Sequence, residues 1–391
     1  MIKEEYLDIA PYGDNEFQHK MAEMVSDPGL EHAVRYVMPD VDYPEFVKGL
    51  KSLTTADQFQ RLVMRPFIEL LAQRTTSGIS SSGIENVADG ETYTFITNHR
   101  DIVLDASFLN LCLMRSGKPT SEIAIGNNLL IYDWITHLVK LNQSFIVKRD
   151  LKMIQALEAA KQLSGYIHFC LNEKRRSVWI AQREGRAKDS NDLTQESLVK
   201  MLGLSGGGTI LENLKSARLL PVSISYEYDP NDYLKAREFL LKRNDPSFKK
   251  SQRDDLFSME TGLLGLKGRV HFAIGECINP GLNQISPDSE RQEVVKLTCS
   301  LIDRTIHRGY MIFPINYIAY DKITGTDRFI DHYTDEEIKM VDNYIDGQLA
   351  KIDLEGLTDD DYDYMRRMML QMYANPLTNK LRAESDNNSP Q

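Results

Sequence analysis

Long apolar segments are missing from this chain of 391 residues. No run of 18 apolar residues occurs, so the sequence predicts no transmembrane helix. The first residues, Met1 to Glu5, have no apolar core of a secretion signal, and this favours a cytoplasmic protein. Hydrophobic residues make up 42% of the chain and charged residues 26%, which is the balance of an ordinary globular protein with a large buried core.

Cysteine and histidine are scarce, and they are not spaced as metal ligands. Each of the four cysteines lies in an apolar segment, as reduced core residues do: Cys112, Cys170, Cys277 and Cys299. The eight histidines form no pair at metal-ligand spacing either. We therefore predict no metal site and no cofactor. A serine hydrolase is also disfavoured, because we identify no nucleophile elbow, in which the serine sits on a strand-to-helix turn.

Positive charge is in deficit. The chain has 46 Lys and Arg against 57 Asp and Glu, a formal net charge of -11. This balance argues against nucleic acid as a partner and against a purely electrostatic grip on a membrane. Against that background, Lys and Arg concentrate between Lys148 and Lys188. Two of these groups follow predicted strands, where α/β sheets bind ligands, and their position favours an anion site.

The chain divides into four predicted regions. Residues 1–75 form a helical N-terminal domain, with apolar spacing near 3.6 over 15–25, 44–53 and 56–74, the last interrupted at Pro66. The Ser/Thr/Gly run from Thr75 to Gly83 marks the boundary to the main domain, residues 76–334. Residues 335–383 are expected to be helices packed on that domain, and the polar residues 384–391 a disordered tail.

Strands and helices alternate along the main domain. Strands are predicted over 92–97, 122–126, 144–148, 177–182, 219–226 and 269–275. Helices are predicted over 105–116, 132–141, 151–164, 191–203, 208–217 and 231–242. This alternation predicts an α/β fold, with a mostly parallel sheet flanked by helices on both faces and a smaller N-terminal helical domain.

The C-terminal region carries helix-start signals and one apolar stripe. Thr334 with Glu337, and Thr358 with Asp361, are typical of capping boxes. Large apolar residues then recur at helical spacing: Tyr362, Met365, Met369 and Met372. Core packing is the ordinary use of such a stripe, and a face that contacts an acyl chain or a membrane is the alternative.

The segment from Thr97 to Asp105 places a histidine and two aspartates between a predicted strand and an apolar helix. An aspartate at a helix N-terminus is favoured by the free N–H groups and by the helix dipole. A neutral imidazole that is oriented by a carboxylate can accept a proton from a hydroxyl. His99 is therefore a candidate general base. Asp105 is the preferred partner, and Asp101 is the alternative.

Three later segments join apolar strands to cations or turns. Ser144 to Arg149 ends in two cations, Val178 to Asp189 runs into a cationic turn, and Leu219 to Tyr226 has a proline near its start. In this order and spacing, together with the His99 segment, they resemble the four sequence blocks of the glycerolipid acyltransferases, over roughly residues 80 to 280. The third block is most similar to Trp-Ile-Ala-Pro-Ser-Gly-Gly-Arg-Asp-Arg of the soluble, plastid-type glycerol-3-phosphate acyltransferases.

The chain departs from the family pattern at two places. The family has four residues between its histidine and its aspartate, whereas five separate His99 from Asp105. A bulge in the loop could take up the extra residue. In the third block, Arg183 and Glu184 replace small residues of the family. Glu184 is then either a salt-bridge partner of the cations or a plain turn residue.

The resemblance implies transfer of a fatty acyl group from a thioester donor, acyl carrier protein or acyl-CoA, to the hydroxyl of glycerol 3-phosphate in phospholipid biosynthesis. It implies His99 as general base, and Gly185 as the turn that lets backbone approach the substrate. Four cations match the phosphate-binding positions: Lys148, Arg149, Arg186 and Lys188. We expect a cytoplasmic protein with transient contact with the inner face of the membrane, and no metal or nucleic acid.

Other acceptors and other roles stay open. The Glu184-Gly185 pair also matches Phe-Pro-Glu-Gly-Thr-Arg of the lysophosphatidate enzymes, so 1-acylglycerol 3-phosphate, or an aminolipid hydroxyl, is the rival acceptor. A non-catalytic protein that binds lipid or phosphate is the alternative of another class. If the donor is the acidic acyl carrier protein, Lys174 to Arg176 is the candidate docking face, and a solvated turn is the plain alternative.

Overall fold

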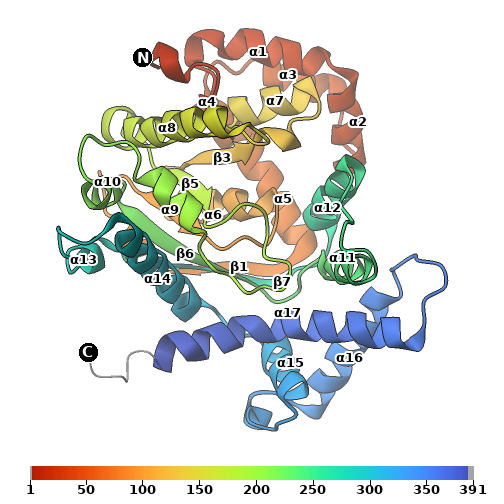
Figure 1. Ribbon diagram of the computed structural model, residues 1–391. Coiled ribbons are helices and arrows are strands. Elements are labelled where there is room, and N and C mark those ends of the chain that lie inside the picture. Colours follow the sequence, from red (N-terminus) through yellow and green to blue (C-terminus); the bar gives the residue numbers. More distant parts are fainter. Residues whose placement is uncertain (1, 386–391) are drawn as a thin grey trace.

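The computed structural model describes residues 2–385 and is centred on one seven-stranded sheet (Figure 1). The strands are β1 (Thr76–Ser82), β2 (Thr94–Thr97), β3 (Glu122–Gly126), β4 (Ser144–Val147), β5 (Val178–Ala181), β6 (Leu219–Tyr226) and β7 (Gly268–Ile274). They lie side by side in the order β1-β7-β6-β2-β5-β3-β4. All neighbours are parallel except β6 and β7, which are antiparallel. The predicted mostly parallel α/β sheet is confirmed.

Helices lie on both faces of the sheet (Figure 1). Those up to the middle of the chain are α1 (Asp14–Ser26), α2 (Pro28–Val37), α3 (Tyr43–Lys51), α4 (Ala56–Phe59), α5 (Arg65–Thr75), α6 (Leu104–Arg115), α7 (Asp133–Leu141), α8 (Met153–Phe169), α9 (Glu196–Leu202) and α10 (Ile210–Ser216). The rest are α11 (Asp232–Asn244), α12 (Gln252–Leu264), α13 (Asn279–Leu282), α14 (Arg291–Gly309), α15 (Pro314–Thr324), α16 (Asp335–Leu349) and α17 (Asp359–Ser385). Within residues 2–385, none has the length and apolar character needed to cross a bilayer.

The alternation of side chains along the strands divides the core into two apolar layers. Ile96 of β2 joins the cluster that contains residues of α8, α9 and α14, whereas the preceding Phe95 joins the cluster that contains α5 and α6. Val178 and Ile180 of β5 face the first cluster, and Trp179 faces the second. Both faces are buried, which explains why the central strands are almost continuously apolar.

The segment predicted as a domain boundary is part of the sheet. Thr76–Ser82 is the edge strand β1, paired in parallel with β7 from almost 200 positions later in the sequence. Its hydroxyls serve this pairing, since the side chains of Ser80 and Ser82 hydrogen-bond Nδ1 and Nε2 of His271 at 2.8 and 2.9 Å. Small polar residues suggest a linker by propensity, but the hydrogen-bond partner of this strand decides its structure.

The N-terminal helices share an apolar cluster with α7. Phe17, Met21 and Phe59 are buried together with Leu141, and Figure 1 shows α1 to α3 along the top of the molecule beside α7. The predicted interruption near Pro66 lies at Gln60–Met64, which forms a π-helical segment between α4 and α5. Proline has no N–H to donate to the carbonyl four residues earlier, so the regular helical ladder cannot continue through this point.

Two predictions about helices were wrong or incomplete. The helix expected over 191–203 begins only at Glu196, because the preceding loop is held by tertiary contacts of Asp192. Helices α2, α12, α13, α14 and α15 were not predicted. For α14 the signal was present, since Val295, Cys299, Ile302 and Ile306 are buried and recur at helical spacing.

Helices α15, α16 and α17 pack together in a third apolar cluster on one side of the sheet (Figure 1). Both predicted capping boxes are present, at Thr334 and Thr358. The apolar stripe is used for core packing in its three methionines, which are at most 2% exposed: Met365, Met369 and Met372. Tyr362 is exposed. Of the predicted tail, Glu384 and Ser385 complete α17, and 386–391 lie outside the described residues. The domain boundaries stay predictions.

Candidate active site

His99 lies just beyond the C-terminal end of β2. The preceding residue, Asn98, fixes this point by bonding the backbone of β6. Its Nδ2 donates to the carbonyl of Ile224 at 2.9 Å, and the Ile224 N–H donates to its Oδ1 at 2.7 Å. The imidazole packs edge-on against Trp179 of β5, with ring centroids 5.8 Å apart. Neighbouring strands thus hold the histidine at the ligand-binding edge of the sheet.

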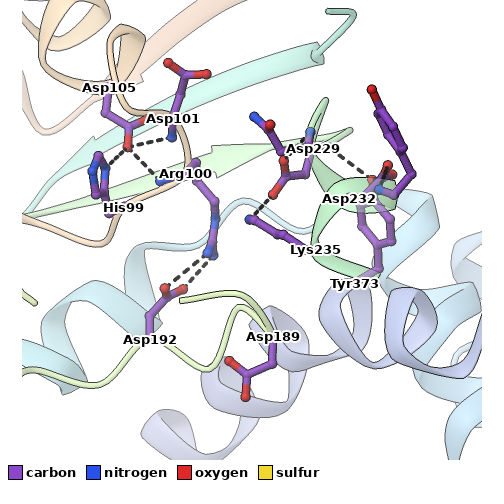
Figure 2. A network of polar contacts seen from close by, with 12 residues as sticks. His99, Arg100, Asp101, Asp105, Asp189, Asp192, Asp229, Asp232, Lys235 and Tyr373 are labelled. Carbon is purple, nitrogen blue, oxygen red and sulfur yellow. Dashed lines mark hydrogen bonds and ion pairs between the residues drawn. The ribbon is translucent and has the colours of Figure 1, made fainter. Parts of the chain in front are cut away.

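Asp105 is the carboxylate that contacts His99 in the structure. Its Oδ2 lies 2.7 Å from Nδ1 of His99 and also accepts the N–H groups of Arg100 and Asp101 at 2.6 and 3.0 Å (Figure 2). Asp105 is fully buried, whereas the His99 side chain is 12% exposed. The carboxylate therefore orients the ring, and it leaves Nε2 without a protein partner among residues 2–385.

Asp101, the alternative partner considered for His99, caps a helix instead. Helix α6 begins at Leu104, before Asp105, and Asp101 caps it by accepting the N–H groups of Val103 and Leu104 at 2.8 and 2.7 Å. The five residues between His99 and Asp105 thus include the residue that caps α6. Asp105 lies in the first turn of the helix, and its side chain contacts His99 from there. Burial, and next the charge of Asp105, raise the pKa of Asp101.

The exposed side of His99 lines a cavity of about 1490 Å³. Helices α2, α3 and α5 to α9 supply most of its wall, together with α12 and the ends of several strands. The part formed by the N-terminal helices is apolar, with side chains such as Leu30, Val34, Val37, Phe46, Leu50 and Phe59. All four predicted phosphate-binding cations also line this cavity. It therefore offers an apolar chamber and a cationic wall beside one histidine.

Arg186 is the predicted cation with an unused donor. Its Nη1 is buried and has no hydrogen-bond partner within residues 2–385. Lys235 of α11, which lines the same cavity, is buried and forms an ion pair with Asp229 (Figure 2). Although burial raises it, Lys235 and then Arg186 hold the pKa of Asp229 below its ordinary value. Lys235 and Arg186 thus both act on the single carboxylate of Asp229. Their two positive charges exceed its one negative charge, and the excess requires compensation.

Lys188 belongs to an adjoining group of three lysines around one carboxylate. Glu238 of α11 is buried and contacts Lys188, Lys242 and Lys250, the last two at 3.0 and 3.2 Å. Lys188 and Lys250 line the cavity. Burial lowers the pKa of Lys188 to about 8, because the charged ammonium is poorly solvated there. We call this wall the α11 cluster. It has two carboxylates, Asp229 and Glu238, and five cations: Arg186, Lys188, Lys235, Lys242 and Lys250.

Lys148 and Arg149 already have protein partners. The ammonium of Lys148 forms an ion pair with Asp8 and donates to Gln162 at 3.0 Å. Arg149 Nη1 lies 3.3 Å from Glu184, so Glu184 is the salt-bridge partner that the sequence left open. Both cations line the cavity, but an incoming anion would compete with these contacts.

Gly185 adopts a conformation that suits a turn. Its φ of +67° is one that side-chain-bearing residues rarely take. The turn is fastened beside it, where the N–H of Glu184 donates to Gln195 Oε1 at 2.7 Å. The cationic loop thus changes direction at Gly185, between Glu184 and Arg186.

Several buried residues around the site were not anticipated from the sequence. Arg100 forms a two-pronged ion pair with Asp192, at 3.1 and 2.6 Å (Figure 2). The Tyr310 hydroxyl donates to the same carboxylate at 2.6 Å. This pair ties the loop after Arg186 to the residue next to His99. Arg100 was visible beside the histidine, but nothing in the sequence indicated Asp192 or Lys235 as its neighbours in space.

The C-terminal helices reach the site through Asp232. Tyr373 of α17 donates to Asp232 Oδ2 at 2.7 Å and accepts the N–H of Asp229 at 3.0 Å. Tyr344 and Gln348 of α16 also donate to Asp232. Burial, and next the charge of Asp229, raise the pKa of Asp232 to about 7. Figure 2 shows this group next to Lys235.

Replacing Asp232 by asparagine should change how stability depends on pH. Because the folded pKa is raised, the wild-type protein loses stability as pH rises from about 4 to 7, by up to roughly 1.4 kcal/mol per pH unit. Asp232→Asn removes this loss, so its free energy of unfolding should gain on the wild type over the same range. Denaturant unfolding at several pH values measures the difference. A constant difference would show that Asp232 does not titrate there.

One serine lies in a Gly-x-Ser-x-Gly sequence but not on the strand-to-helix turn of a nucleophile elbow. Gly203 to Gly207 have serine between glycines, but Ser205 lies in the turn between α9 and α10, not after a strand. Its hydroxyl donates to the carbonyl of Lys161 at 3.3 Å. The described contacts of Ser205 include no histidine, so this serine has no base to activate it.

Comparison with known proteins finds similarity over part of the chain. Residues 78–218 match the family model described as Acyltransferase. Among solved structures, the chain is similar to the 1-acyl-sn-glycerophosphate acyltransferase of Thermotoga maritima, with a TM-score of 0.37 and 11% identity over 73% of this chain and 92% of that one. No curated protein matches the sequence. The residues that match the family model include His99, Asp105 and all four predicted cations.

Proposed function

We propose that this protein transfers a fatty acyl group from a thioester to the hydroxyl of glycerol 3-phosphate. The observation that carries the proposal is the shared cavity. His99, which Asp105 orients, and Arg186, whose Nη1 has no partner within residues 2–385, both line this cavity, and the rest of it is largely an apolar chamber. These three features suit, respectively, a hydroxyl, a phosphate and a fatty chain.

His99 would act as the general base. Its Nε2 accepts the proton of the acceptor hydroxyl as that oxygen attacks the thioester carbonyl. The tetrahedral intermediate then expels the thiolate, which takes the proton from His99 and leaves as a thiol. Asp105 holds Nδ1 and stabilises the transient imidazolium. The products are an ester and a thiol, and the histidine returns to its starting state.

The phosphate would bind at the α11 cluster, with Arg186 as its main contact. A dianion there supplies the negative charge that Asp229 and Glu238 do not provide for five cations. Arginine can bind two phosphate oxygens at once, which also fixes the acceptor's orientation. The predicted contributions of Lys148, Arg149 and Lys188 stay predictions, and each would require exchange of an existing ion pair for the substrate.

The acyl chain would lie in the apolar chamber. Its wall comes from helices that precede the acyltransferase-family residues, including Val34, Leu50 and Phe59. This arrangement gives the N-terminal helices a function in selecting the chain. The cellular location expected from the sequence, cytoplasmic with reversible contact with the inner face of the membrane, stays a prediction.

The position of Lys174 to Arg176 does not favour the docking of an acyl carrier protein. These residues precede β5, at the end of the strand opposite to the edge that bears His99. Lys174 forms an ion pair with the buried carboxylate of Glu122, and Arg175 donates to the carbonyl of Gly90 at 2.5 Å. We therefore explain these cations by structural contacts, and the donor must be found by assay.

One assay tests the proposed function and its rival acceptor. Purified protein is incubated with glycerol 3-phosphate or with its 1-acyl derivative, each against acyl-CoA and against acyl carrier protein thioesters. We expect turnover with glycerol 3-phosphate. Turnover with the 1-acyl derivative alone would replace the proposed acceptor and keep the transferase. Binding without turnover, for all four combinations, would support a non-catalytic protein that binds lipid or phosphate.

A further inference from the structure

One oxygen of the Asp105 carboxylate has no partner among residues 2–385. Its Oδ2 contacts His99 and accepts two backbone N–H groups (Figure 2). Its Oδ1 is buried and accepts no hydrogen bond within the described part of the chain. A buried carboxylate oxygen without a donor is costly, and each such atom requires an explanation. Because the same carboxylate orients His99, any group that donates to Oδ1 also acts on the histidine.

The hydroxyl of Tyr226 is a buried donor without an acceptor among the same residues. Tyr226 is the last residue of β6 and is 7% exposed, and its hydroxyl has no hydrogen-bond partner within 2–385. It lies two positions after Ile224, whose backbone is bonded to the end of β2. It also shares an apolar cluster with Leu104, the residue before Asp105. Tyr226 therefore lies beside the segment that runs from His99 to Asp105.

Asp105 is the main charged neighbour of this hydroxyl. Burial, and next the charge of Asp105, raise the pKa of Tyr226 well above its ordinary value. The phenol is thus protonated at neutral pH, and its O–H is available as a donor. The guanidinium of Arg100, which could also donate, is already paired with Asp192. A hydrogen bond to a carboxylate favours its charged form, and such a bond is strong where water is excluded.

A second donor and acceptor face each other next to this pair. Both side-chain polar atoms of Asn231, and Oδ2 of Asp101, are buried without a partner within residues 2–385. A side chain at Gly262 of α12 would lie 2.1 Å from Asp101 Oδ2 and 3.1 Å from Asn231 Nδ2, so both atoms face this glycine. The amide of Asn231 is thus placed to serve Asp101, which leaves the hydroxyl of Tyr226 for Asp105.

Lys267 supplies positive charge to the two aspartates. It is fully buried, and its ammonium donates to backbone carbonyls, at 2.8 Å to that of Gly265. Burial lowers the pKa of Lys267 to about 8, although the charges of Asp101, Asp229 and Asp105 raise it. Its described hydrogen bonds end on carbonyls, so Lys267 compensates the charge of Asp105 without satisfying Oδ1.

We propose that Tyr226 is a positioning residue for His99 and that its hydroxyl donates to Oδ1 of Asp105. Hydrogen bonds of an active site are often long or poorly aligned in the free enzyme and tighten when substrate binds. With Oδ1 engaged, the carboxylate resists rotation away from His99. The imidazole then keeps its proton on Nδ1 and presents Nε2 to the acceptor hydroxyl. The role in transfer rests on the proposed function, whereas the hydrogen bond itself does not.

Titration of His99 in Tyr226→Phe tests the hydrogen bond without any substrate. The full-length protein carries ¹³C-labelled histidine, and His99→Ala assigns the resonance. Tyr226→Phe keeps the ring that fills the core and removes the donor. The midpoint of the His99 titration should rise by about half a pH unit or more, because the carboxylate charge then acts on the imidazole alone. In an Asp105→Asn background, which has no charged acceptor, Tyr226→Phe should leave the midpoint unchanged.

Tyr166→Phe is the matched control. The hydroxyl of Tyr166 also donates to a buried carboxylate, that of Glu122 at 2.6 Å. Glu122 begins β3, so this bond lies at the end of the sheet opposite to His99. Tyr166→Phe removes a comparable buried hydroxyl, and it should leave the His99 midpoint at its wild-type value. Equal shifts in the two variants would show a general loss of packing and would overturn the proposal.

The remaining outcomes separate this proposal from the proposed function. An unchanged midpoint in Tyr226→Phe would overturn the hydrogen bond, and so would a shift produced by Asn231→Leu but not by Tyr226→Phe. In transfer assays, the acid limb of kcat/KM reports the base of the free enzyme, and in Tyr226→Phe it should move to higher pH with the midpoint. A shifted midpoint, beside an absence of transfer in both the wild type and the variant, would contradict the function alone.

Discussion

Replacing His99 by alanine should lower the turnover number by at least two orders of magnitude and leave the protein folded. The expected loss is that of a positioned general base, about 10² to 10⁴-fold. The fold should tolerate the change, because the imidazole is at the edge of the cavity and, among residues 2–385, it hydrogen-bonds only Asp105. Turnover is measured at saturating substrates, and circular dichroism checks the fold. Turnover within a few-fold of the wild type would rule out His99 as the base.

Asp105 and Asp101 form a matched pair for the same question. Asp105→Asn removes the charge that stabilises the imidazolium, and we expect turnover to fall by about two orders of magnitude or more. Asp101→Asn keeps an oxygen that can cap α6, and its carboxylate does not contact His99, so turnover should change much less. The reverse order of effects would mean that Asp101 supports the base during the reaction.

Replacing Arg186 by alanine should raise the Michaelis constant for glycerol 3-phosphate roughly ten- to a hundredfold. The change removes a charge-assisted contact of about 1.5–3 kcal/mol. The constant for the acyl donor should hardly change, because the phosphate contact concerns the acceptor alone. Initial rates over a grid of both substrates give the two constants. The prediction depends on the proposed acceptor, and the same grid with inorganic phosphate as competitor shows whether the lost site binds phosphate.

Two arginine controls and one lysine sharpen this result. Arg367→Ala removes an exposed arginine of α17 and should alter neither constant. Arg186→Lys keeps the charge without the planar fork, and its effect should be intermediate. Lys148→Ala should raise the acceptor constant less than Arg186→Ala does, because Asp8 and Gln162 already engage Lys148. Equal effects of Arg186→Ala and Arg367→Ala would assign Arg186 to a solvated basic face.

The N-terminal helices and the C-terminal helices contribute to the cavity in different ways. The N-terminal helices contribute the apolar wall, with side chains such as Phe46 and Leu50. The C-terminal helices contribute no residue to the wall, but Tyr373 and Tyr344 hold the segment between Asp229 and Lys235 through Asp232. Changes in the first set should therefore alter the choice of acyl chain, and changes in the second should act through the position of Lys235.

The sequence predicted the features that depend on local pattern. Strands such as 219–226 were found because apolar residues cluster between turn signals, and the parallel sheet followed from their alternation with helices. His99 was identified from a short motif at a strand end, and Arg186 from its match to a cation of the third block of the family that the chain resembles. Each of these features has its cause within a few residues along the chain.

Contacts between distant segments decided what the sequence left open or led us to predict wrongly. Thr76–Ser82 is a strand only because β7 pairs with it. Asp105 contacts His99 while Asp101 caps α6, a choice made by the path of the loop in three dimensions. Arg186 differs from Lys148 because Asp8, far away in sequence, engages Lys148 and no described residue engages Arg186 Nη1. Local patterns specify which groups can react, but the balance of buried charge is a property of neighbours in space, and only the tertiary structure determines those neighbours.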